Sequence, residues 1–559
     1  MTSNHILMSG APEGFDATIV NKEAQQGGVI HVARDAHRLQ AMRAALDFFV
    51  PELPVFHFPA WDCLPFDRVS PNADISAQRM SSLAGFVAQM PKSYVVLTTL
   101  SAASQRVPAR ATVKAAVFRA SVHSRVDEKA LRAFLVRMGF VQTPTVMEPG
   151  DYSIRGGIID IFPPGLSEPI RLDFFGDTLD GIRQFDPATQ RTVKSLETVD
   201  LSPVSEVILD EASIRRFRQN YRIEFGAAGT DDPLYEAISA GRKHQGVEHW
   251  LPFFHDQMDT LFDYLPDATV ILDDQSTPAR LARWDTIADQ YDARKTAFTQ
   301  KGRLDTIYKP TPPELLYLND AAWQDALAER RQVALSVLPQ PTGLNALDAG
   351  ARLGRNFAPE RQNEALSLFG AVSDHIKKMG ATKPVVITSY SSGARERLSG
   401  LLQDEGHGEL REIRNVKDLR GAGTYLAVSQ LEHGFETEDL IVITEQDILG
   451  DRLVRNTKKR KRADNFLTET QSLSRGDLVV HVDHGVGRFK ALEIISAAGA
   501  DHECLLLEYA ENSKLYLPVE NIELLSRYGH DEGLLDRLGG GAWQAKKARL
   551  KERIREMAE

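Results

Sequence analysis

The sequence predicts a multidomain α/β protein that ends in a small antiparallel β-barrel and a helix. The chain has 559 residues, which is too many for one hydrophobic core and corresponds to about three to five domains. In most of the chain up to residue 452, short apolar runs alternate with segments of helical period, as in parallel sheets with helical crossovers. From residue 472 onward, apolar residues follow period two between polar turns, which is typical of short antiparallel strands.

The composition excludes several classes of protein. With 66 Lys and Arg against 77 Asp and Glu, the formal net charge is −11, so the chain as a whole is not a polyanion binder, although local basic patches can exist. Cys63 and Cys504 cannot build a disulfide framework and lack metal-ligand spacing, which fits a reducing cytoplasm. No segment has the pattern of a secretion signal or the length of a membrane span. We therefore expect a soluble, cytoplasmic protein with no membrane contact.

The first region, residues 1–114, has the pattern of a parallel sheet with helices, and residues 205–345 return to the same architecture. Val29–Ala33 is a short apolar strand, and Asp35 is placed to cap the helix that follows. Further buried strands are expected at Val55–Phe58 and Tyr94–Thr99. Four residues at helical spacing predict one buried stripe on the first long helix: Leu39, Met42, Leu46 and Phe49.

One loop of this region has the position of a phosphate loop but not its chemistry. A working loop needs backbone N–H donors in a Gly-rich turn, a Lys, and a Ser or Thr. The candidate is Ser9–Asp16, in which Phe15 and Asp16 replace the Lys-Ser/Thr pair. Pro12 removes a donor, and Glu13 and Asp16 would repel phosphate. We therefore expect no ATP hydrolysis, no catalytic residue and no cofactor in this chain.

Two other patterns could suggest chemistry. Thr269–Asp274 looks like a nucleotide-binding strand that ends in two carboxylates, Asp273 and Asp274, but without a partner lysine it is better explained as a buried strand with acidic residues at its mouth. Three histidines could suggest a metal, but their spacings of five and six residues place them on no common helical or strand face: His244, His249 and His255. We therefore predict no metal site.

The second region, residues 115–204, is predicted to be a smaller α+β insert. In one of its strands, period two places Ile170, Leu172 and Phe174 on one face, and Arg171, Asp173 and Phe175 on the other. A phenylalanine beside an arginine and an aspartate is unusual on a solvent-facing surface, whereas arginine and aromatic residues together are typical of interface hot spots. Either another domain of the chain covers Phe175, or this face binds a partner.

Residues 360–452 are predicted to form a third, small α/β domain. Pro384–Thr388, Tyr425–Val428 and Leu440–Thr444 are short apolar runs separated by helix-like or loop segments, and no catalytic constellation accompanies them. The linker that follows, residues 453–471, carries five adjacent cations that are a candidate DNA contact, although such runs are more often solvated linkers. These cations are Lys458, Lys459, Arg460, Lys461 and Arg462.

Residues 472–530 are predicted to form an SH3/Tudor-like barrel of short strands. Two strands are indicated by alternation: Leu505, Leu507 and Tyr509 alternate with Leu506 and Glu508, and Leu515, Leu517 and Val519 alternate with Lys514, Tyr516 and Pro518. Glu511–Ser513 supplies a polar turn, and Gly485 and Gly487 allow sharp bends. The odd spacing of His481 and His484 predicts opposite faces of one strand, which leaves them structural, and Asp483 does not change that.

The insert and the first region resemble known families. Phe58–Leu83 is similar to the nucleotide-binding fold of UvrB, in the degenerate form found at the start of transcription-repair coupling factors. The block from Arg155 to Phe175 resembles the domain that UvrB and coupling factors share for binding UvrA. That resemblance implies that Arg155, Arg171 and Phe175 contact UvrA.

The barrel sequence, residues 476–492 and 503–529, resembles the RNA-polymerase-interacting module of CarD-type regulators and coupling factors. The resemblance implies that the module adds its sheet edge to a strand of the polymerase β subunit. The implied contact residues are Ile495, which matches a family contact, and then Ile494, Lys514 and Tyr516 as weaker candidates.

The third domain resembles the variable third domain of coupling factors at Leu431–Phe435 and Ile448–Gly450. Residues 540–559 are predicted to be a helix without a stop signal, which in the family leads to an ATP-driven DNA translocase motor beyond this chain. That motor would use ATP and Mg²⁺ and would supply most DNA contacts. Taken together, the resemblance implies a non-catalytic, monomeric adaptor that binds RNA polymerase and recruits UvrA to stalled transcription for nucleotide excision repair.

Two alternative functions remain open at this level. One is an ATP-dependent helicase or nuclease that uses the UvrB-like fold, against which the degenerate loop argues. The other is a stand-alone CarD-like transcription regulator with extra domains, which intact polymerase binding without UvrA binding would favour.

Overall fold

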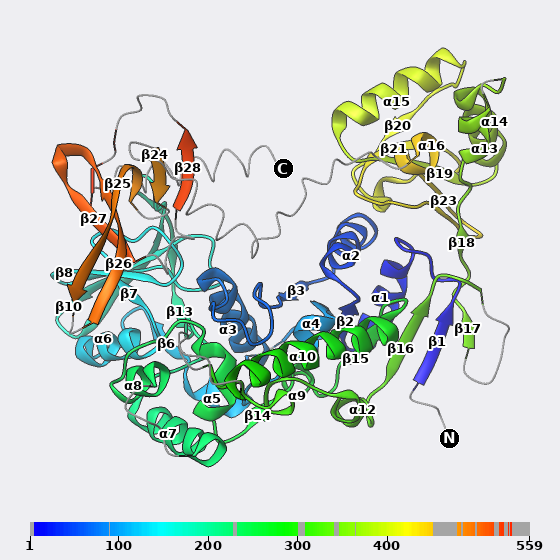
Figure 1. Ribbon diagram of the computed structural model, residues 1–559. Helices are drawn as coiled ribbons and strands as arrows, with labels where there is room; N and C mark the ends of the chain where they lie inside the picture. Colours follow the sequence, from blue (N-terminus) through cyan, green and yellow to red (C-terminus); the bar gives the residue numbers. More distant parts are fainter. Residues whose placement is uncertain are drawn as a thin grey trace. The chain divides into compact units, whose positions relative to one another are not determined.

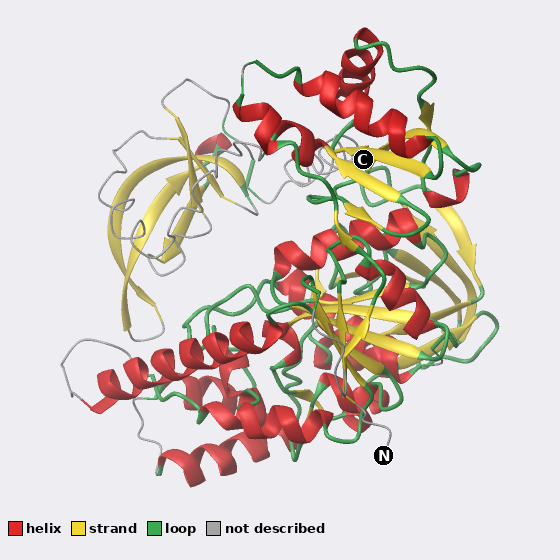
Figure 2. Ribbon diagram, turned by 90° about the vertical axis from the view of Figure 1, so that its right-hand side faces the viewer, coloured by secondary structure: helices red, strands yellow, loops and turns green. Residues whose placement is uncertain are grey.

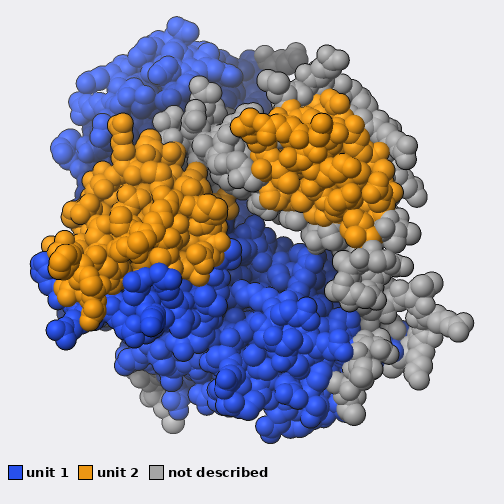
Figure 3. Space-filling view, turned by 90° about the vertical axis from the view of Figure 1, so that its left-hand side faces the viewer, with its two compact units in different colours: residues 1–141, 163–166, 198–452 blue, residues 142–162, 167–197, 453–559 orange. Residues whose placement is uncertain are grey.

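The computed structural model divides the chain into two compact units (Figure 3). Unit 1 comprises residues 1–141, 163–166 and 198–452, and unit 2 comprises residues 142–162, 167–197 and 453–559. The structure describes residues 5–88, 90–226, 232–299, 308–339, 346–363, 365–450, 478–481, 484–497, 500–518, 525–529, 535, 537 and 538. The basic run Lys458–Arg462, Asp483 and the predicted helix at residues 540–559 lie outside the described residues.

Unit 1 is built around a seven-stranded sheet in which every neighbouring pair of strands is parallel (Figure 1). Its strands are β1 (His5–Ser9), β2 (Gly28–Ala33), β3 (Val55–Phe58), β4 (Tyr94–Thr99), β15 (Thr269–Leu272), β16 (Gln332–Ser336) and β17 (Ala346–Asp348). Their order in the sheet is β17-β1-β16-β15-β2-β4-β3. The parallel sheet predicted from the apolar runs is therefore confirmed, and the strands that follow the insert complete it.

Helices cover both faces of this sheet (Figure 2). One face is covered by α1 (Asp16–Ala24) and α2 (Ala36–Phe49). The other face is covered by α3 (Ala73–Val87), α4 (Leu100–Ala103), α9 (Leu261–Tyr264) and α12 (Asp320–Leu327). The Asp35 side chain accepts a hydrogen bond from the backbone N–H of Arg38, so the predicted cap of α2 is confirmed. The predicted stripe of α2 is buried as well.

A helical lobe with an aromatic core extends from the sheet. It contains α7 (Glu211–Phe225), α8 (Pro233–Ser239), the 3₁₀ segment η1 (Val247–Phe254), α10 (Ser276–Thr299) and α11 (Pro313–Leu316). Phe217 stacks on Phe254 with 4.8 Å between the ring centroids, and Tyr221 and Trp250 are buried beside them. Smaller elements of unit 1 are α5 (Arg110–Ala115), α6 (Glu128–Arg137), and the strand pairs β5 (Val107–Pro108) with β14 (Met258–Asp259) and β6 (Phe118–Ser121) with β13 (Thr198–Leu201).

Residues 352–449 form a second, mixed sheet of unit 1 with its own helices, as predicted for the third α/β domain. The strands are β18 (Arg352–Leu353), β19 (Pro384–Ser389), β20 (Arg411–Glu412), β21 (Gly423–Val428), β22 (Phe435–Glu436) and β23 (Ile441–Thr444), in the order β18-β22-β23-β19-β21-β20. The helices are α13 (Ala358–Gln362), α14 (Leu368–Gly380), α15 (Ser392–Asp404) and α16 (Glu445–Leu449), with the 3₁₀ turn η2 (Val416–Asp418). One side of this sheet joins the same hydrophobic core as α1 and α2.

The insert contributes an antiparallel sheet to unit 2, in the order β12-β11-β10-β9-β8-β7. Its strands are β7 (Val141–Gln142), β8 (Asp151–Arg155), β9 (Ile158–Ile161), β10 (Ile170–Phe175), β11 (Thr178–Phe185) and β12 (Thr192–Leu196). Ile170 and Leu172 are fully buried, whereas Arg171 and Asp173 are half-buried and Phe175 is exposed. The two faces predicted by period two are therefore present in β10.

The C-terminal strands form a separate five-stranded antiparallel sheet in the order β27-β26-β25-β24-β28. The strands are β24 (Leu478–His481), β25 (Gly485–Ala497), β26 (Ala500–Glu508), β27 (Lys514–Pro518) and β28 (Leu525–Gly529), and η3 (Ala510–Asn512) is the turn between β26 and β27. A Cβ atom at Gly487 would lie 2.9 Å from the ring of buried Tyr509, so only glycine fits at this position. Leu505, Leu507, Tyr509 and Leu517 are buried, and Leu515 packs against them. The alternation does not separate a buried from an exposed face along β26, because Leu506 is buried as well.

One prediction for this sheet is wrong. His481 and His484 do not lie on opposite faces of one strand, because their ring centroids are only 4.6 Å apart. The reason is that the two histidines do not share a strand: His481 ends β24 and pairs with Gly485 at the start of β25, and His484 directly precedes β25. In the part of the chain that the structure describes, no group of three His, Cys, Asp or Glu side chains is arranged to hold a metal ion. Nor does any described helix combine the length and apolar character needed to cross a membrane.

Candidate functional site

The loop after β1 folds as the sequence pattern suggests, but its donors are used within the chain. Gly10 and Gly14 have φ angles of 63° and 97°, which are left-handed values that favour glycine. The backbone N–H of Gly14 donates to the carboxylate of Asp16 at 3.0 Å, which is the kind of donor that a phosphate loop would turn toward a nucleotide. The position of a bound anion is thus taken by a side chain of the loop itself.

A buried arginine stands beside this loop. Arg38 of α2 forms ion pairs with Asp16 and, at 3.2 Å from its Nε to Oδ1, with Asp273 at the end of β15. All three side chains are almost fully buried, and Glu13 lies 3.5 Å from the same Nε. The sequence pattern offered no lysine as a partner for Asp273. In the structure, the basic partner of Asp273 is Arg38 of α2 rather than a lysine of the loop.

Burial dominates the electrostatics of the cluster. Burial raises the pKa of Asp16 to about 7, against the opposing effect of Arg38, and the nearby charges of Asp273 and Glu13 raise it further. On β2, burial lowers the pKa of His31 to about 3, and Arg38 lowers it further. His31 is therefore neutral at ordinary pH.

The third domain covers the loop. Phe15 packs edge-on against Phe435, with 5.6 Å between ring centroids, and Leu431 lies 3.2 Å from the site of a Cβ atom at Gly14. Beside this contact, Nε2 of His37 lies 2.9 Å from Oε1 of Glu432. The segment Leu431–Phe435, singled out in the sequence, is thus the segment that packs on the loop.

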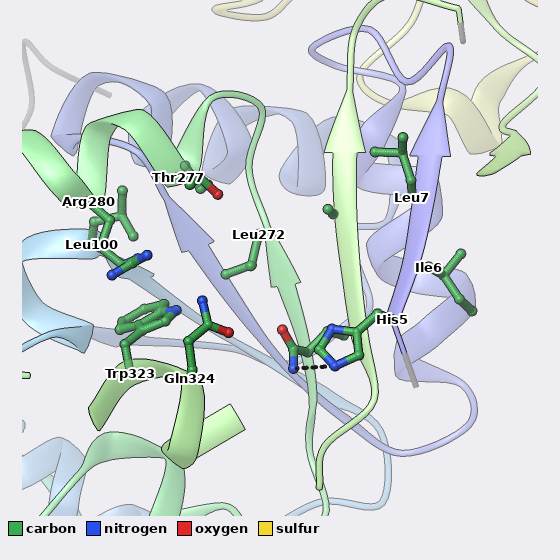
Figure 4. A pocket seen from close by; sticks show the side chains of 12 residues that line it. His5, Ile6, Leu7, Leu100, Leu272, Thr277, Arg280, Trp323 and Gln324 are labelled. Carbon is green, nitrogen blue, oxygen red and sulfur yellow. Dashed lines mark hydrogen bonds between the residues drawn. The ribbon is translucent and has the colours of Figure 1, made fainter. Parts of the chain in front are cut away.

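A cavity of about 330 Å³ lies elsewhere on the same sheet, beside β1, β15 and β16 (Figure 4). Trp323 and Arg280 close one side, and Arg280 is already paired with Asp320 at 2.5 Å. At the other side, Gln332 is 3.4 Å from Nε2 of His5. Among the described residues, no carboxylate lines this cavity, and its arginine is paired with Asp320.

The polar face of the insert sheet carries the three residues assigned to it from the sequence. Arg171 donates two hydrogen bonds to Asp160 on the neighbouring strand, at 2.7 and 2.9 Å, and its guanidinium lies 4.8 Å from the centroid of the Phe185 ring. These contacts hold Arg171 in one orientation while leaving its side chain 22% exposed. Phe175 is 83% exposed.

The pairing register places further residues on this face. Asp173 is opposite Ile158, which is opposite Arg155, so the three form one row across β10, β9 and β8. Arg155 is exposed and donates to the backbone carbonyl of Pro144. Ile158 and Asp160 were not assigned a role from the sequence. The sequence shows that Asp160 is an acidic residue in the preceding strand. Only the strand register places it opposite Arg171.

The C-terminal sheet presents an unpaired edge. β24 pairs with Gly485–Arg488 of β25, and β26 pairs with β25 from Arg488 onward. No described strand pairs with the other edge of β25 beyond Arg488. Backbone groups on such an edge are available to an added strand.

The strand register also shows which of the candidate residues lie on the same face of this sheet. Ile495 pairs with His502, and Leu506, four residues further along β26, pairs with Tyr516. Because side chains alternate, Ile495, Tyr516 and Lys514 belong to one face of the sheet. Ile494 lies in β25, but its side chain is outside the part of the chain that the structure describes. Lys514 and Tyr516 are both exposed.

Three family models match separate parts of the chain. A UvrB interaction domain matches residues 118–206, an MFD D3 domain matches residues 379–448, and a CarD-like/TRCF RID domain matches residues 473–529. The fold and these matches define a multidomain protein that joins a UvrB-type interaction domain to a CarD-like domain.

Comparison with whole proteins is more specific: the chain matches the N-terminal portion of transcription-repair-coupling factors. It is 30% identical to the transcription-repair-coupling factor of Rickettsia bellii over 537 residues, which is 96% of this chain and 46% of that protein. It is 32% identical to the one from Escherichia coli, over 97% of this chain and 47% of that protein. For the one from Bacillus subtilis the identity is 23%, over 99% of this chain. The chain spans about half the length of the relatives that it matches.

Proposed function

We propose that this chain is the adaptor part of a transcription-repair coupling factor, which binds the β subunit of RNA polymerase and recruits UvrA to stalled transcription. One observation carries the proposal: the same chain matches a UvrB interaction domain and a CarD-like/TRCF RID domain. An ATP-driven DNA translocase motor would belong to the part of the relatives that this chain does not span.

The UvrA-binding surface in this proposal is the face of Arg155, Arg171 and Phe175. A largely exposed aromatic ring on the same strand face as an arginine gives a partner both an apolar anchor and a directional charge. Because Asp160 and Phe185 already fix the guanidinium of Arg171, little side-chain entropy is lost when a partner binds it. The exposed Ile158 extends the apolar area next to Arg155.

The polymerase-binding surface in this proposal is the unpaired edge of β25, with Ile495 beside it. Main-chain hydrogen bonds to an added strand would supply affinity, and side chains on the face of Ile495, Tyr516 and Lys514 would supply specificity. We further propose that the C-terminal sheet belongs to an SH3/Tudor-like barrel, and that Ile494 contributes less than Ile495.

The first region is proposed to be a UvrB-like nucleotide fold that has lost its nucleotide. An incoming phosphate would meet Asp16, Glu13 and Asp273, with Arg38 already neutralised by them. Phe435 and Leu431 would also have to move. These contacts support a loop that binds no nucleotide, and they weigh against the alternative of a helicase or nuclease. The absence of a cofactor and of a metal from the chain stays a prediction. The domain limits given by the sequence pattern remain predictions.

A bridging experiment tests the adaptor function. Immobilised RNA polymerase is incubated with the chain and then with UvrA, and retention of both proteins is measured. The wild-type chain should retain UvrA on the polymerase, Phe175→Ala should retain the chain but not UvrA, and Ile495→Asp should abolish retention of both. UvrA recruitment that survives both Arg171→Ala and Phe175→Ala would refute the UvrA surface. Polymerase binding without any UvrA binding by the wild-type chain would favour a stand-alone CarD-like regulator.

A further inference from the structure

Helix α7 carries an arginine stripe that none of the surfaces above uses (Figure 1). Four of its fifteen residues are arginines. Arg216 points back to the lobe, where its Nε lies 2.8 Å from Asp256 and its Nη1 donates to the carbonyl of Phe254. Arg215, Arg218 and Arg222 follow at i, i+3 and i+7, so they form one exposed row on the helix.

Nearby carboxylates do not neutralise this row. Glu211 lies 3.7 Å from Arg215, but both side chains are largely exposed, so this i, i+4 pair contributes little. Arg218 and Arg222 instead contact the neutral ring of Tyr235 on α8: Nε of Arg218 donates to its hydroxyl at 3.3 Å, and the guanidinium of Arg222 lies 5.5 Å from its centroid. Among the described residues, no carboxylate forms an ion pair with Arg218 or Arg222.

Tyr235 also orients the row. It is buried and packs against Phe217 and Tyr221 in the aromatic core of the lobe, so the two arginines rest on a rigid base. Between them, the exposed amide of Gln219 adds a neutral hydrogen-bonding group. Arg215, Arg218, Gln219, Arg222 and Ile223 line an open groove of about 510 Å³.

The chemistry of the groove favours a phosphate backbone. Arginine forks bind phosphate bidentately, and the row from Arg215 to Arg222 is about 10 Å long, at 1.5 Å per helical residue. One strand of duplex DNA presents about three phosphates over that length. A single-stranded ligand would call for exposed aromatic rings to stack on, and the aromatic ring in this row, Tyr235, is buried. A surface that binds another protein usually contains an exposed aromatic side chain, whereas the exposed apolar residue beside this row is Ile223.

We propose that the row of Arg215, Arg218 and Arg222 on α7 is a binding surface for the sugar–phosphate backbone of duplex DNA. The contact is independent of base sequence, because arginines on phosphates fix position without reading bases. The row shares no residue with the UvrA-binding and polymerase-binding surfaces proposed above, and it gives a chain of net charge −11 a local site for a polyanion.

The test uses a short fluorescein-labelled DNA duplex of mixed sequence and fluorescence anisotropy at several salt concentrations. The charge-reversal variant Arg215→Glu, Arg218→Glu, Arg222→Glu should bind the duplex at least about tenfold more weakly at low salt. The slope of log K against log salt should become shallower by about 0.9 per lost phosphate contact, or about 2.7 for three. The matched variant Arg215→Lys, Arg218→Lys, Arg222→Lys keeps the charges and should retain most of the slope.

Two further controls make the outcome decisive. The variant Arg43→Glu, Arg132→Glu, Arg397→Glu has the same change in net charge on exposed positions of three other helices, and it should bind nearly as the wild type does. Repeating the α7 reversal in a chain with Lys458–Arg462 changed to glutamine separates the row from that basic run. Unchanged duplex affinity in both backgrounds would overturn the proposal. If the α7 reversal instead weakened binding to UvrA or RNA polymerase alone, the row would be a protein contact.

Discussion

The ring of Phe15 packs edge-on against Phe435 of the third domain, with 5.6 Å between the ring centroids. Phe435 also packs on Phe49 at the end of α2, at 5.5 Å. The loop of the first region, its flanking helix and the third domain therefore share one hydrophobic core. The degenerate loop serves as packing surface, and this arrangement leads to the first prediction.

Phe435→Ala should destabilise unit 1 by about 3–5 kcal/mol, because it removes a ring that is almost fully buried and leaves a cavity. Thermal unfolding should show a clear downward shift of the transition. Leu353→Ala on β18, which pairs with Phe435 but is half exposed, is the control and should change the free energy of unfolding by less than about 1 kcal/mol. Neither variant should bind Mg-ATP, because Asp16 and Arg38 remain in place. ATP binding by Phe435→Ala would show that the packing of the third domain on the loop, and not the loop itself, excludes the nucleotide.

Asp16→Asn should change how stability depends on pH. The folded pKa of Asp16 is raised to about 7 from an ordinary value of 3.8, so its neutral form stabilises the fold below about pH 4, and this contribution is lost as the pH rises through 7. Because the folded pKa of Asp16 lies about 3 units above its ordinary value, the free energy of unfolding falls by at most about 4 kcal/mol over this pH range. Buried neutral His31 acts in the opposite direction, since it disfavours the fold as the pH falls below about 6.5.

The difference between the wild type and Asp16→Asn isolates Asp16 from His31. Denaturant unfolding of both proteins between pH 5 and pH 8 should show that the variant gains stability relative to the wild type as the pH rises. Parallel curves for the two proteins would mean that Asp16 stays ionised beside Arg38 throughout this range.

Asp160→Asn should weaken UvrA binding although its side chain is almost fully buried. The change removes the negative charge from the bidentate pair with Arg171. The guanidinium then loses its fixed orientation on the proposed UvrA-binding surface. We expect a stability loss of about 1–3 kcal/mol and a measurable drop in UvrA affinity by surface plasmon resonance. Asp200→Asn makes the same chemical change in the exposed pair with Arg119 and should leave UvrA binding unaltered. Full UvrA affinity in Asp160→Asn would show that Arg171 needs no positioning.

Ile495→Asp should lower the affinity for the polymerase β subunit by about 2 kcal/mol or more, which is about 30-fold, because a charge would lie against the added strand. Tyr516→Ala should have a smaller effect in the same direction. Leu492→Asn, at an exposed position on the opposite pleat of β25, is the control and should bind more nearly as the wild type does. Equal losses for Ile495 and Leu492 variants would argue against a one-sided contact.

Local pattern predicted much of this protein. Period two separated Arg171 and Phe175 from the core side of β10, and helical spacing identified the buried stripe of α2, because both periodicities follow from backbone geometry alone. The loss of the loop lysine could also be read directly, since it is a matter of which residue occupies a position.

The sequence by itself therefore determined which elements form, which faces they bury and which chemistry the loop lacks. Only the tertiary structure decided that Arg38 pairs with Asp273, 235 residues away, and that Phe435 closes over Phe15. It also brought His481 close to His484, and among the described residues it left Arg218 and Arg222 of α7 without an ion pair, whereas Arg216 pairs with Asp256. The physical reason is that burial, pairing and charge neutralisation depend on neighbours in space, and no local periodicity encodes which distant segments those neighbours come from.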